Sequence, residues 1–259
     1  MVRMAEIVNK PFRIRGLSRK ITTLCKKLYA GFISLKMNMF QTPAYEKYWS
    51  ERGASDHGDW DDKHSKDWVL GYWNSETHPH RIPLLDAIKK YRPSGVLEIG
   101  CNCGPNLSLI AQEFPLADIT GIDINRVAIE RGKELFSKEK ITNVTLVVGK
   151  ADDLGMFGDG QFDVVVSDAV LMYIGPDKIL PVLKEMVRVT KKSLLLLEWH
   201  DGQTDYKGIF NEHWVRNYEQ IPQLFPHVKV NVTKLPPELW NDRMWQQFGY
   251  VIEVTKTHE

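Results

Sequence analysis

The sequence contains few cysteines and no long apolar run. Its 259 residues include three cysteines, Cys25, Cys101 and Cys103. An odd number this small provides no disulfide framework, and it therefore favours a reducing compartment. No apolar stretch approaches the roughly 20 residues with which a helix crosses a bilayer. These absences argue against a disulfide-stapled secreted domain and against a membrane-spanning protein, and they predict a cytoplasmic one.

Charge of one sign is also missing, because acidic and basic residues nearly balance at a formal net charge of +1. Residues 1–40 nevertheless hold nine basic residues and one acidic residue, a charge of +8. This leaves 25 basic and 32 acidic residues, or −7, for the remainder. A negatively charged remainder offers nucleic-acid phosphates no broad docking face, so nucleic acid is not expected as a partner.

Residues 1–41 are predicted to form a basic amphipathic helical arm. Apolar residues recur at helical spacing from Ile21 to Leu35, and Ser18 suits the N-cap. A basic amphipathic helix can lie on an anionic membrane surface, so peripheral membrane contact through residues 18–36 is one expectation. The helix could instead dock on its own domain or on a second subunit, or serve as an organelle-targeting segment. The sequence leaves these alternatives and the oligomeric state open.

Residues 42–80 are rich in aromatic side chains. The aromatic residues here are Trp49, Trp60, Trp68, Trp73, Tyr45, Tyr48 and Tyr72. Aromatic rings supply large contact areas, and a closed lid keeps water from a reaction, so we expect a lid or substrate-binding segment. Histidine and aspartate also crowd residues 56–67, but without a recognised metal-binding spacing such as His-Glu-x-x-His. We therefore expect a solvated acidic loop there and no metal site.

A short glycine-containing motif follows this segment. Residues 96–104 read Val-Leu-Glu-Ile-Gly-Cys-Asn-Cys-Gly, and Asp123 follows 19 residues after Gly104. Glycines let the backbone approach a ligand closely, and a later carboxylate can accept hydrogen bonds from ribose hydroxyls. The motif therefore predicts a site for a nucleoside cofactor.

The loop also indicates which nucleoside cofactor to expect. A dinucleotide fingerprint needs glycines where this chain has Gly100, Asn102 and Pro105, so two of three are missing, and the Gly-Lys-Ser/Thr ending of a phosphate loop is absent. The pattern acid-x-Gly-x-x-x-Gly, with Glu98 as the acid, resembles the class I S-adenosylmethionine-dependent methyltransferases. That family usually has a third glycine where Asn102 stands, and asparagine tolerates the left-handed backbone conformation better than most residues. The resemblance implies S-adenosylmethionine as the cofactor.

Strand and helix patterns alternate after residue 81, which predicts an α/β fold with a parallel sheet. After the strand that leads into Gly100, strands are expected over 117–123, 144–148, 162–168, 193–197, 228–232 and 250–255, and helices over 127–138, 179–189 and 210–224. The resemblance implies that residues 81–259 form a Rossmann-like, doubly wound, seven-stranded sheet whose last strand is antiparallel. Ligands of such sheets bind beyond the carboxyl ends of the strands.

The resemblance also assigns cofactor-binding roles. The loop from Gly100 to Gly104 would hold the methionine part, with Glu98 supporting the loop or the ammonium group. Asp123 would accept the ribose hydroxyls. In the loop after the third strand, Lys150 occupies the family's usual acid position, so Asp152 is its expected substitute. The full set of expected cofactor-binding residues is Glu98, Gly100, Asn102, Gly104, Asn106, Asp123, Ile124, Ala151, Asp152 and Asp168.

Methyl transfer to a hydroxyl requires in-line positioning and removal of a proton. A histidine or carboxylate suits the second task, and the candidates are His200, Asp168 and His80, with His200 expected first. The alternative for His200 is a surface loop residue, and for the segment 78–81 a cap of the helix that follows. The expected acceptor-binding residues are Tyr173, Trp199 and Trp73.

The acceptor is the least determined part of the prediction. Residues 45–52 and the Gly-Tyr-Trp-Asn stretch look like those of small-molecule or glycan methyltransferases. We therefore expect O-methylation of a small-molecule or glycan acceptor, including a lipid-linked one at the cytoplasmic face of a membrane. An RNA or protein methyltransferase and a non-catalytic cofactor-binding platform are the alternatives. The fourth strand is followed by Ser167-Asp168-Ala169-Val170 and not by the Asp/Asn-Pro-Pro-Tyr/Phe signature of base-amino methylation.

Overall fold

The computed structural model describes residues 45–53, 67–203, 208–210 and 213–257. The predicted basic arm, with its membrane-binding residues 18–36, and residues 54–66 of the predicted lid lie outside the described residues. In the described part of the chain, no helix is both long and apolar enough to cross a membrane.

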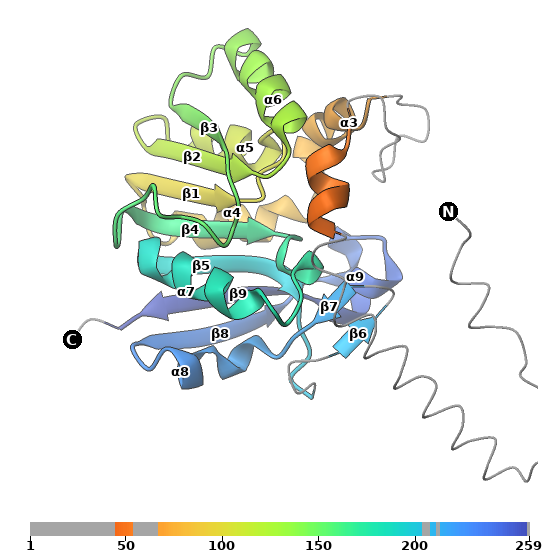
Figure 1. The fold of residues 1–259 in the computed structure, drawn as a ribbon, viewed down its shortest axis with the longest axis vertical. Coiled ribbons are helices and arrows are strands. Elements are labelled where there is room, and N and C mark those ends of the chain that lie inside the picture. Colours follow the sequence, from red (N-terminus) through yellow and green to blue (C-terminus); the bar gives the residue numbers. More distant parts are fainter. Residues whose placement is uncertain (1–44, 54–66, 204–207, 211–212, 258–259) are drawn as a thin grey trace, which may run out of the picture. The chain divides into compact units, whose positions relative to one another are not determined.

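The centre of the fold is a seven-stranded sheet with the order β3-β2-β1-β4-β5-β9-β8 (Figure 1). The strands are β1 (Gly95–Ile99), β2 (Asp118–Asp123), β3 (Val144–Val148), β4 (Phe162–Asp168), β5 (Thr190–Trp199), β8 (Val228–Lys234) and β9 (Gly249–Lys256). β1 to β5 pair in parallel, whereas β9 lies antiparallel between β5 and β8. The predicted Rossmann-like sheet with an antiparallel last strand is confirmed.

The two faces of the sheet carry separate cores, because successive strand side chains point to opposite sides. In β4, Val164 and Val166 belong to one core, and Val165 belongs to the other. The first core receives α3 (Trp68–Asn74), α4 (Arg81–Lys89), α5 (Pro105–Glu113) and α6 (Arg126–Lys138). The second receives α7 (Ile179–Val189) and α8 (Ile221–Leu224), which lie in front of the sheet in Figure 1.

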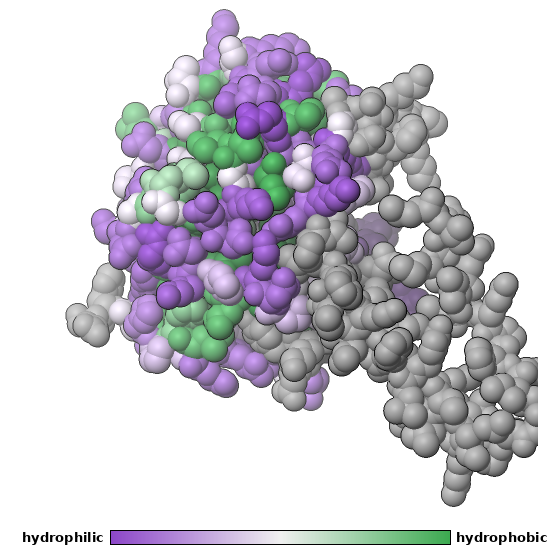
Figure 2. Space-filling model, in the orientation of Figure 1, coloured by the Kyte–Doolittle hydropathy of each residue, from purple (hydrophilic) through white to green (hydrophobic). Residues whose placement is uncertain are grey.

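Figure 2 shows one face of the molecule, on which many of the side chains are hydrophilic, as expected for the surface over the two cores. Apolar side chains on that face lie among hydrophilic ones. Large exposed apolar side chains, such as those of Ile82, Leu116 and Leu180, come from separate elements of the chain. The apolar residues of the strands are instead buried, which makes the sheet a firm support for the loops at its ends.

The predicted helix over residues 210–224 is wrong. The structure has the strand pair β6 (Gly208–Phe210) and β7 (His213–Val215), then a 3-10 turn, η3 (Tyr218–Gln220), and only the single turn of α8. Pro222 explains part of the difference, because it lies in the first turn of α8, where a missing N–H is tolerated, and would interrupt a longer helix. Asn217 also accepts the N–H of Glu219 through its side chain and so starts η3 separately.

Candidate active site

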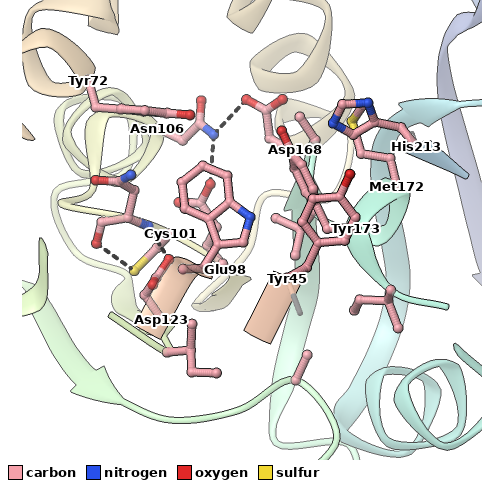
Figure 3. A pocket seen from close by; sticks show the side chains of 18 of the residues that line it. Tyr45, Tyr72, Glu98, Cys101, Asn106, Asp123, Asp168, Met172, Tyr173 and His213 are labelled. Atoms are coloured by element: carbon pink, nitrogen blue, oxygen red, sulfur yellow. Dashed lines mark hydrogen bonds between the residues drawn. The ribbon is translucent and has the colours of Figure 1, made fainter. Parts of the chain in front are cut away.

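A cavity of about 570 Å³ opens beyond the carboxyl ends of β1, β2 and β4. The sheet order reverses between β1 and β4, and ligands of open α/β sheets bind at such a point. Figure 3 shows Glu98, Cys101 and Asp123 at one end of the cavity, and Met172, Tyr173 and His213 at the other. We call these the carboxylate end and the aromatic end.

The loop after β1 folds through left-handed backbone conformations. Gly100, Asn102 and Gly104 have φ angles of 71°, 52° and 95°. A Cβ atom on Gly100 would lie 2.4 Å from a methyl carbon of Val170, so glycine is required there by contact as well as by conformation. Asn102 adopts the left-handed conformation that its side chain tolerates. Gly104 then serves as the N-cap residue of α5.

Asp123, at the end of β2, holds this loop in place. Its Oδ2 accepts the backbone N–H of Asn102 at 2.8 Å, and its Oδ1 accepts the N–H of Asn125 at 2.7 Å. A carboxylate oxygen can accept more than one hydrogen bond, so Asp123 keeps acceptor capacity toward the cavity, which it lines. Burial raises the pKa of its carboxyl, whereas the two N–H donors act in the opposite direction.

A buried polar cluster connects β1, α5 and β4. Asn106 donates through Nδ2 to Glu98 Oε1 at 2.6 Å and to Asp168 Oδ2 at 3.0 Å (Figure 3). Arg81 donates through Nη1 to Asn106 Oδ1 at 2.6 Å and to Asp168 Oδ2 at 3.0 Å. Glu98 Oε2 and Asp168 Oδ1 are buried and have no hydrogen-bond partner among the described residues. Two buried oxygen atoms in the cavity wall could therefore accept hydrogen bonds from a ligand.

The two carboxyl groups differ in charge state. Burial raises the pKa of Glu98 to about 8, although the hydrogen bond from Asn106 opposes this. Burial also disfavours the charge of Asp168, but contacts with His80, Arg81 and Asn106 outweigh it and lower its pKa to about 2. Asp168 is thus ionised near neutral pH, and Glu98 becomes ionised only when a cation or donor approaches it.

The loop after β3 closes the carboxylate end. Gly149, Lys150, Ala151 and Asp152 all line the cavity, together with Ile124 after β2. The Lys150 ammonium lies 3.7 Å from Glu46, and Asp152 pairs with Lys178 at 3.1 Å. Lys178 also pairs with Glu46.

Aromatic rings from separate parts of the chain make up the aromatic end. The ring of Tyr173 packs edge-on against Tyr45 and Trp49, with centroids 5.2 and 5.3 Å apart. The ring of His213 lies 4.8 Å from Tyr173 and 5.2 Å from Trp199. On another part of the wall, Trp240 and Trp245 stack nearly parallel at 3.8 Å. The indole nitrogens of Trp49 and Trp199 are buried and have no hydrogen-bond partner within the described part of the chain.

Two buried side chains, those of Glu198 and Arg216, hold the loop after β4. Glu198 Oε1 accepts the Ser167 hydroxyl at 3.0 Å and the N–H groups of Val170 and Leu171 at 2.8 Å each. Glu198 Oε2 accepts the N–H of Met172 at 3.2 Å. Arg216 donates to the Leu171 carbonyl at 2.6 Å, at the other side of the short turn η2 (Leu171–Tyr173), and also to the Ile174 carbonyl. Asp168 lies shortly before this turn and Tyr173 is its last residue, so the turn positions both.

The predicted catalytic residues have very different surroundings. Asp168 lines the cavity, and His80 lies directly behind it with Nε2 3.2 Å from Asp168 Oδ2. His80 also contacts His78, and it is His78 that lines the cavity. His200 is absent from the cavity wall, and its Nδ1 accepts the N–H of Tyr218 at 3.2 Å. The predicted role of His200 stays a prediction, but its position connects it to the segment after β7 and not to the cavity.

Most of the other predicted residues meet at the cavity. The predicted residues in its wall are Glu98, Gly100, Asn102, Asn106, Asp123, Ile124, Ala151, Asp152, Asp168, Tyr173 and Trp199. Gly104 is buried beside Phe136 and shapes the loop from behind. Trp73 lies away from the cavity and packs against Phe136 in the core at 5.2 Å. The preceding residue Tyr72 lines the cavity instead, because neighbouring helix positions face in different directions.

Several wall residues carry no sequence signal that predicts a role for them. These are His78, Arg81, Met172, Lys178, Trp240 and Trp245. The cluster His78-Pro79-His80-Arg81 was noticed as a motif, but its partner Asp168 lies 87 residues beyond Arg81. Trp240 and Trp245 come from α9 (Arg243–Phe248) and the loop before it, a segment with no cofactor motif. Only the fold brings these residues to the cavity.

No group of three or more histidine, cysteine, aspartate or glutamate side chains is placed to hold a metal ion within the described ranges. The two described cysteines, Cys101 and Cys103, are free and buried. Burial raises the pKa of both thiols.

Comparisons with known proteins agree with this geometry. Residues 96–193 match the family model described as "Methyltransferase domain". Cycloartenol-C-24-methyltransferase 1 of Oryza sativa subsp. japonica is 34% identical over 137 residues, which cover 49% of this chain and 38% of that protein. The chain spans about half the length or less of the curated relatives that it matches.

Two solved structures extend the similarity beyond the matched domain. Phosphoethanolamine N-methyltransferase 1 of Haemonchus contortus has a TM-score of 0.62 at 15% identity and covers 86% of this chain and 50% of that one. Geranyl diphosphate C-methyltransferase of Streptomyces coelicolor A3(2) has a TM-score of 0.60 at 13% identity and covers 84% and 98%. At these identities the likeness concerns the fold.

Proposed function

We propose that the chain is a class I S-adenosylmethionine-dependent methyltransferase and that it methylates a hydroxyl group of a small-molecule or glycan acceptor. The match of residues 96–193 to a methyltransferase domain and the order of the strands support the first part. One observation carries the proposal. A single cavity joins a carboxylate end, which suits the cofactor, to an aromatic end, which suits an uncharged acceptor. Asp168 lies where the two ends meet.

The carboxylate end fits S-adenosylmethionine. Glu98 Oε2 and Asp168 Oδ1 are buried acceptors that the cofactor's ammonium group would satisfy. Asp123 would accept the ribose hydroxyls, and the missing Cβ of Gly100 leaves the backbone free to bend around the ligand. When bound, the cofactor supplies a methyl group on a sulfonium sulfur and leaves as a neutral thioether.

The adenine is proposed to lie between Ile124 and the loop after β3. Ala151 and Asp152 line the cavity there. Asp152 is proposed to replace the acid that relatives carry at the position of Lys150. The ion pair between Lys150 and Glu46 supports this assignment, because it directs the ammonium of Lys150 to the helical segment 45–51.

The charges at the cavity favour an acceptor without phosphate. Among the described wall residues, the lysine and arginine side chains are Arg81, Lys150 and Lys178, and each forms an ion pair with an acidic residue. A phosphate would have to break these pairs or be buried without a cation. The two structural neighbours, in contrast, are described with geranyl diphosphate and with phosphoethanolamine. Stacked indoles such as those of Trp240 and Trp245 offer a flat apolar surface to a sugar ring or another uncharged ring.

The hydrogen-bonding groups at the aromatic end favour a hydroxyl over an amine as the methyl acceptor. An indole N–H is a donor only, and the buried indoles of Trp49 and Trp199 have no partner in the part of the chain that the structure describes. A hydroxyl oxygen can accept such a hydrogen bond with one lone pair and attack the methyl group with the other, whereas an amine nitrogen has only one lone pair, which the attack itself uses. The arrangement therefore supports O-methylation.

An RNA or protein acceptor is the alternative. Relatives of this chain include a ribosomal protein L11 methyltransferase of Acetivibrio thermocellus, 35% identical over 88 residues. Such an acceptor would have to insert one base or side chain past Tyr45, Trp49 and Tyr173, which pack against one another. A binding platform without catalysis is the third alternative.

Two measurements test the proposal. Calorimetric titration with S-adenosylhomocysteine should give a binding isotherm that Asp123→Ala weakens at least about tenfold, since two or more hydrogen bonds of about 1 kcal/mol each are lost. Asp118→Ala, at the exposed start of β2, is the matched control. Incubation with methyl-labelled cofactor and fractionated extract should then label a small-molecule or glycan fraction. Label confined to RNA or protein would overturn the acceptor class, and binding without label in any fraction would support the platform.

A further inference from the structure

Four charged side chains meet at one part of the cavity wall. The ammonium of Lys178 forms ion pairs with Glu46 Oε1 and with Asp152 Oδ2, the latter at 3.1 Å. The ammonium of Lys150 lies 3.7 Å from the other carboxylate oxygen of Glu46. All four residues line the cavity. They come from the helical segment 45–51, the loop after β3 and the residue before α7, so the ion pairs connect three separate parts of the chain.

Lys178 is the fixed side of this arrangement. It is the N-cap residue of α7, and its carbonyl accepts the backbone N–H of Val182 at 3.1 Å. Six residues of α7 are buried, so the ammonium of Lys178 projects from a firmly packed part of the fold. Glu46, in contrast, belongs to the segment 45–51, whose residues are all half-buried or exposed. The ion pair therefore fixes Glu46 relative to α7.

The helical segment 45–51 is held differently at its two ends. Near its carboxyl end, Asn125 donates through Nδ2 to the carbonyl of Trp49 at 2.5 Å. Near its amino end, Glu46 forms the two ion pairs described above. Salt screens ion pairs between partly exposed groups, whereas a hydrogen bond between uncharged groups has no net charges to screen. The amino end should therefore be the part of the segment that responds to salt.

The amino end of the segment also contributes to the aromatic end of the cavity. Tyr45 directly precedes Glu46, and its ring packs edge-on against Tyr173 at 5.2 Å (Figure 3). The same ring stacks with His213 at 6.0 Å. Trp49, about one helical turn after Glu46, packs against Tyr173 at 5.3 Å. The position of Glu46 thus determines where two of the rings at the aromatic end lie.

The surroundings of the Lys178–Glu46 pair decide whether it matters. Isolated ion pairs on protein surfaces contribute little, because solvent screens them and ordering the side chains costs entropy. Here the two side chains are only 28% and 30% exposed, and the same ammonium also binds Asp152. The pair between Lys133 and Glu130, by comparison, is 49% and 55% exposed and lies within α6. Of these two pairs, only the first joins separate segments, so it can affect the shape of the cavity.

We infer that Lys178 is a positioning residue, which holds the helical segment 45–51 through Glu46 and so completes the site of an uncharged acceptor. The inference rests on the proposed function, because it takes the aromatic end to be the acceptor site. It has an unusual consequence for the acceptor. Acceptor binding should weaken as the ionic strength rises, although the acceptor itself carries no charge.

The hold on the segment can be measured without any acceptor. Hydrogen exchange of the full chain with S-adenosylhomocysteine, followed by mass spectrometry, reports local opening of residues 45–51. Lys178→Met should speed exchange in this peptide about three- to tenfold, as expected for the loss of a partly buried ion pair within a network. Lys178→Arg keeps the charge and should restore most of the protection. Lys133→Met is the matched control and should leave this peptide unchanged.

The second test uses the compound that the wild-type protein is found to methylate. Glu46→Gln should raise its KM about three- to tenfold with kcat unchanged, because binding alone is affected. The wild-type KM should rise about threefold between about 0.05 and about 0.5 M KCl, whereas the KM of Glu46→Gln should not depend on salt. Combining Glu46→Gln with Lys178→Met should raise KM less than the product of the single effects, because both remove the same contact.

The outcomes distinguish this inference from the proposed function. If Lys178→Met and Lys133→Met exchange alike over residues 45–51, the inference fails, whatever is methylated. If exchange becomes faster but Glu46→Gln keeps the wild-type KM and its salt dependence, Lys178 does not position the acceptor site, and the inference also fails. If the wild-type protein methylates nothing, the proposed function fails, and the exchange result alone decides whether Lys178 holds the segment.

Discussion

Glu198 lies inside the protein on β5, the strand next to β4, and its carboxylate accepts a hydrogen bond from the backbone N–H of Leu171 at 2.8 Å. The same carboxylate also accepts hydrogen bonds from the N–H groups of Val170 and Met172. It thus replaces the backbone carbonyl groups that a single 3-10 turn cannot provide for these N–H groups. Residues 170–172 connect Asp168 to Tyr173, so a core residue sets the distance between the two ends of the cavity.

Glu198→Gln is therefore expected to destabilise the protein without removing volume. The amide keeps one oxygen, but its NH2 group must face a backbone N–H, which leaves a buried donor without an acceptor and costs about 1–3 kcal/mol. Urea unfolding should show this as a lower midpoint with an unchanged m-value. Glu130→Gln, on the exposed side of α6, should stay within about 0.5 kcal/mol of wild type. An equal effect of both substitutions would contradict the assigned role.

Cofactor binding should depend on pH through Glu98. Its pKa of about 8 means that the carboxyl is protonated in the free protein at pH 6–7. If the cofactor's ammonium group binds to the Glu98 carboxylate, the pKa of Glu98 is lower in the complex than in the free protein. Binding below pH 8 therefore releases a proton. The Kd for S-adenosylhomocysteine should consequently fall up to about tenfold per unit as pH rises from 6 to 8.

Calorimetry in buffers of different ionisation enthalpy measures this released proton directly. Glu98→Gln should remove both the proton release and the slope of Kd with pH. A wild-type Kd that stays constant from pH 6 to 8 would show that the ammonium is bound by Asp168 alone.

Gly100→Ala should weaken both folding and cofactor binding. The new Cβ would lie 2.4 Å from Val170, and a φ of 71° is strained by about 1–2 kcal/mol for alanine. We expect a loss of about 2–4 kcal/mol in unfolding free energy, combining this strain with overpacking. Gly155→Ala is the matched control, because its φ is not positive and the nearest atom lies 3.6 Å away. Adding Val170→Ala should recover only the part due to the contact.

The two thiols of the loop after β1 should resist alkylation. Both Cys101 and Cys103 are buried, and burial raises the pKa of each, so little reactive thiolate forms near neutral pH. Peptides with these residues should remain unmodified after iodoacetamide treatment of the folded protein and become fully modified in denaturant. Rapid labelling of the native protein would mean that the loop opens readily.

The carboxylate end of the cavity could be predicted because its residues follow strand ends. Glu98, Asp123 and Asp168 each come at or next to the end of a parallel strand, and such ends meet at one edge of a sheet. Their spacing along the chain is enough to place them together. Asparagine tolerates the left-handed conformation better than most residues, and Asn102 adopts it in place of the usual glycine.

The aromatic end of the cavity depends on contacts between distant segments, which no local pattern encodes. Trp73 and Tyr72 are neighbours in a helix, and only the direction of α3 decides that Tyr72 faces the cavity. His200 ends β5 as expected, but its imidazole turns toward Tyr218. The helix predicted over residues 210–224 had plausible apolar spacing, yet the strand pair β6 and β7 forms instead and brings His213 to the cavity.

Asn125 has a consequence for the order in which the ligands bind. Its backbone N–H donates to Asp123, whereas its side chain donates to the carbonyls of Trp49 and Arg52 at 2.5 and 2.9 Å. One residue thus connects Asp123, which we propose binds the ribose, with the segment 45–51, which we propose covers the acceptor. Each ligand should therefore tighten the other by the same factor, as thermodynamic reciprocity requires. We expect sequential kinetics in which the cofactor enters first and the acceptor binds a site that the cofactor has already organised.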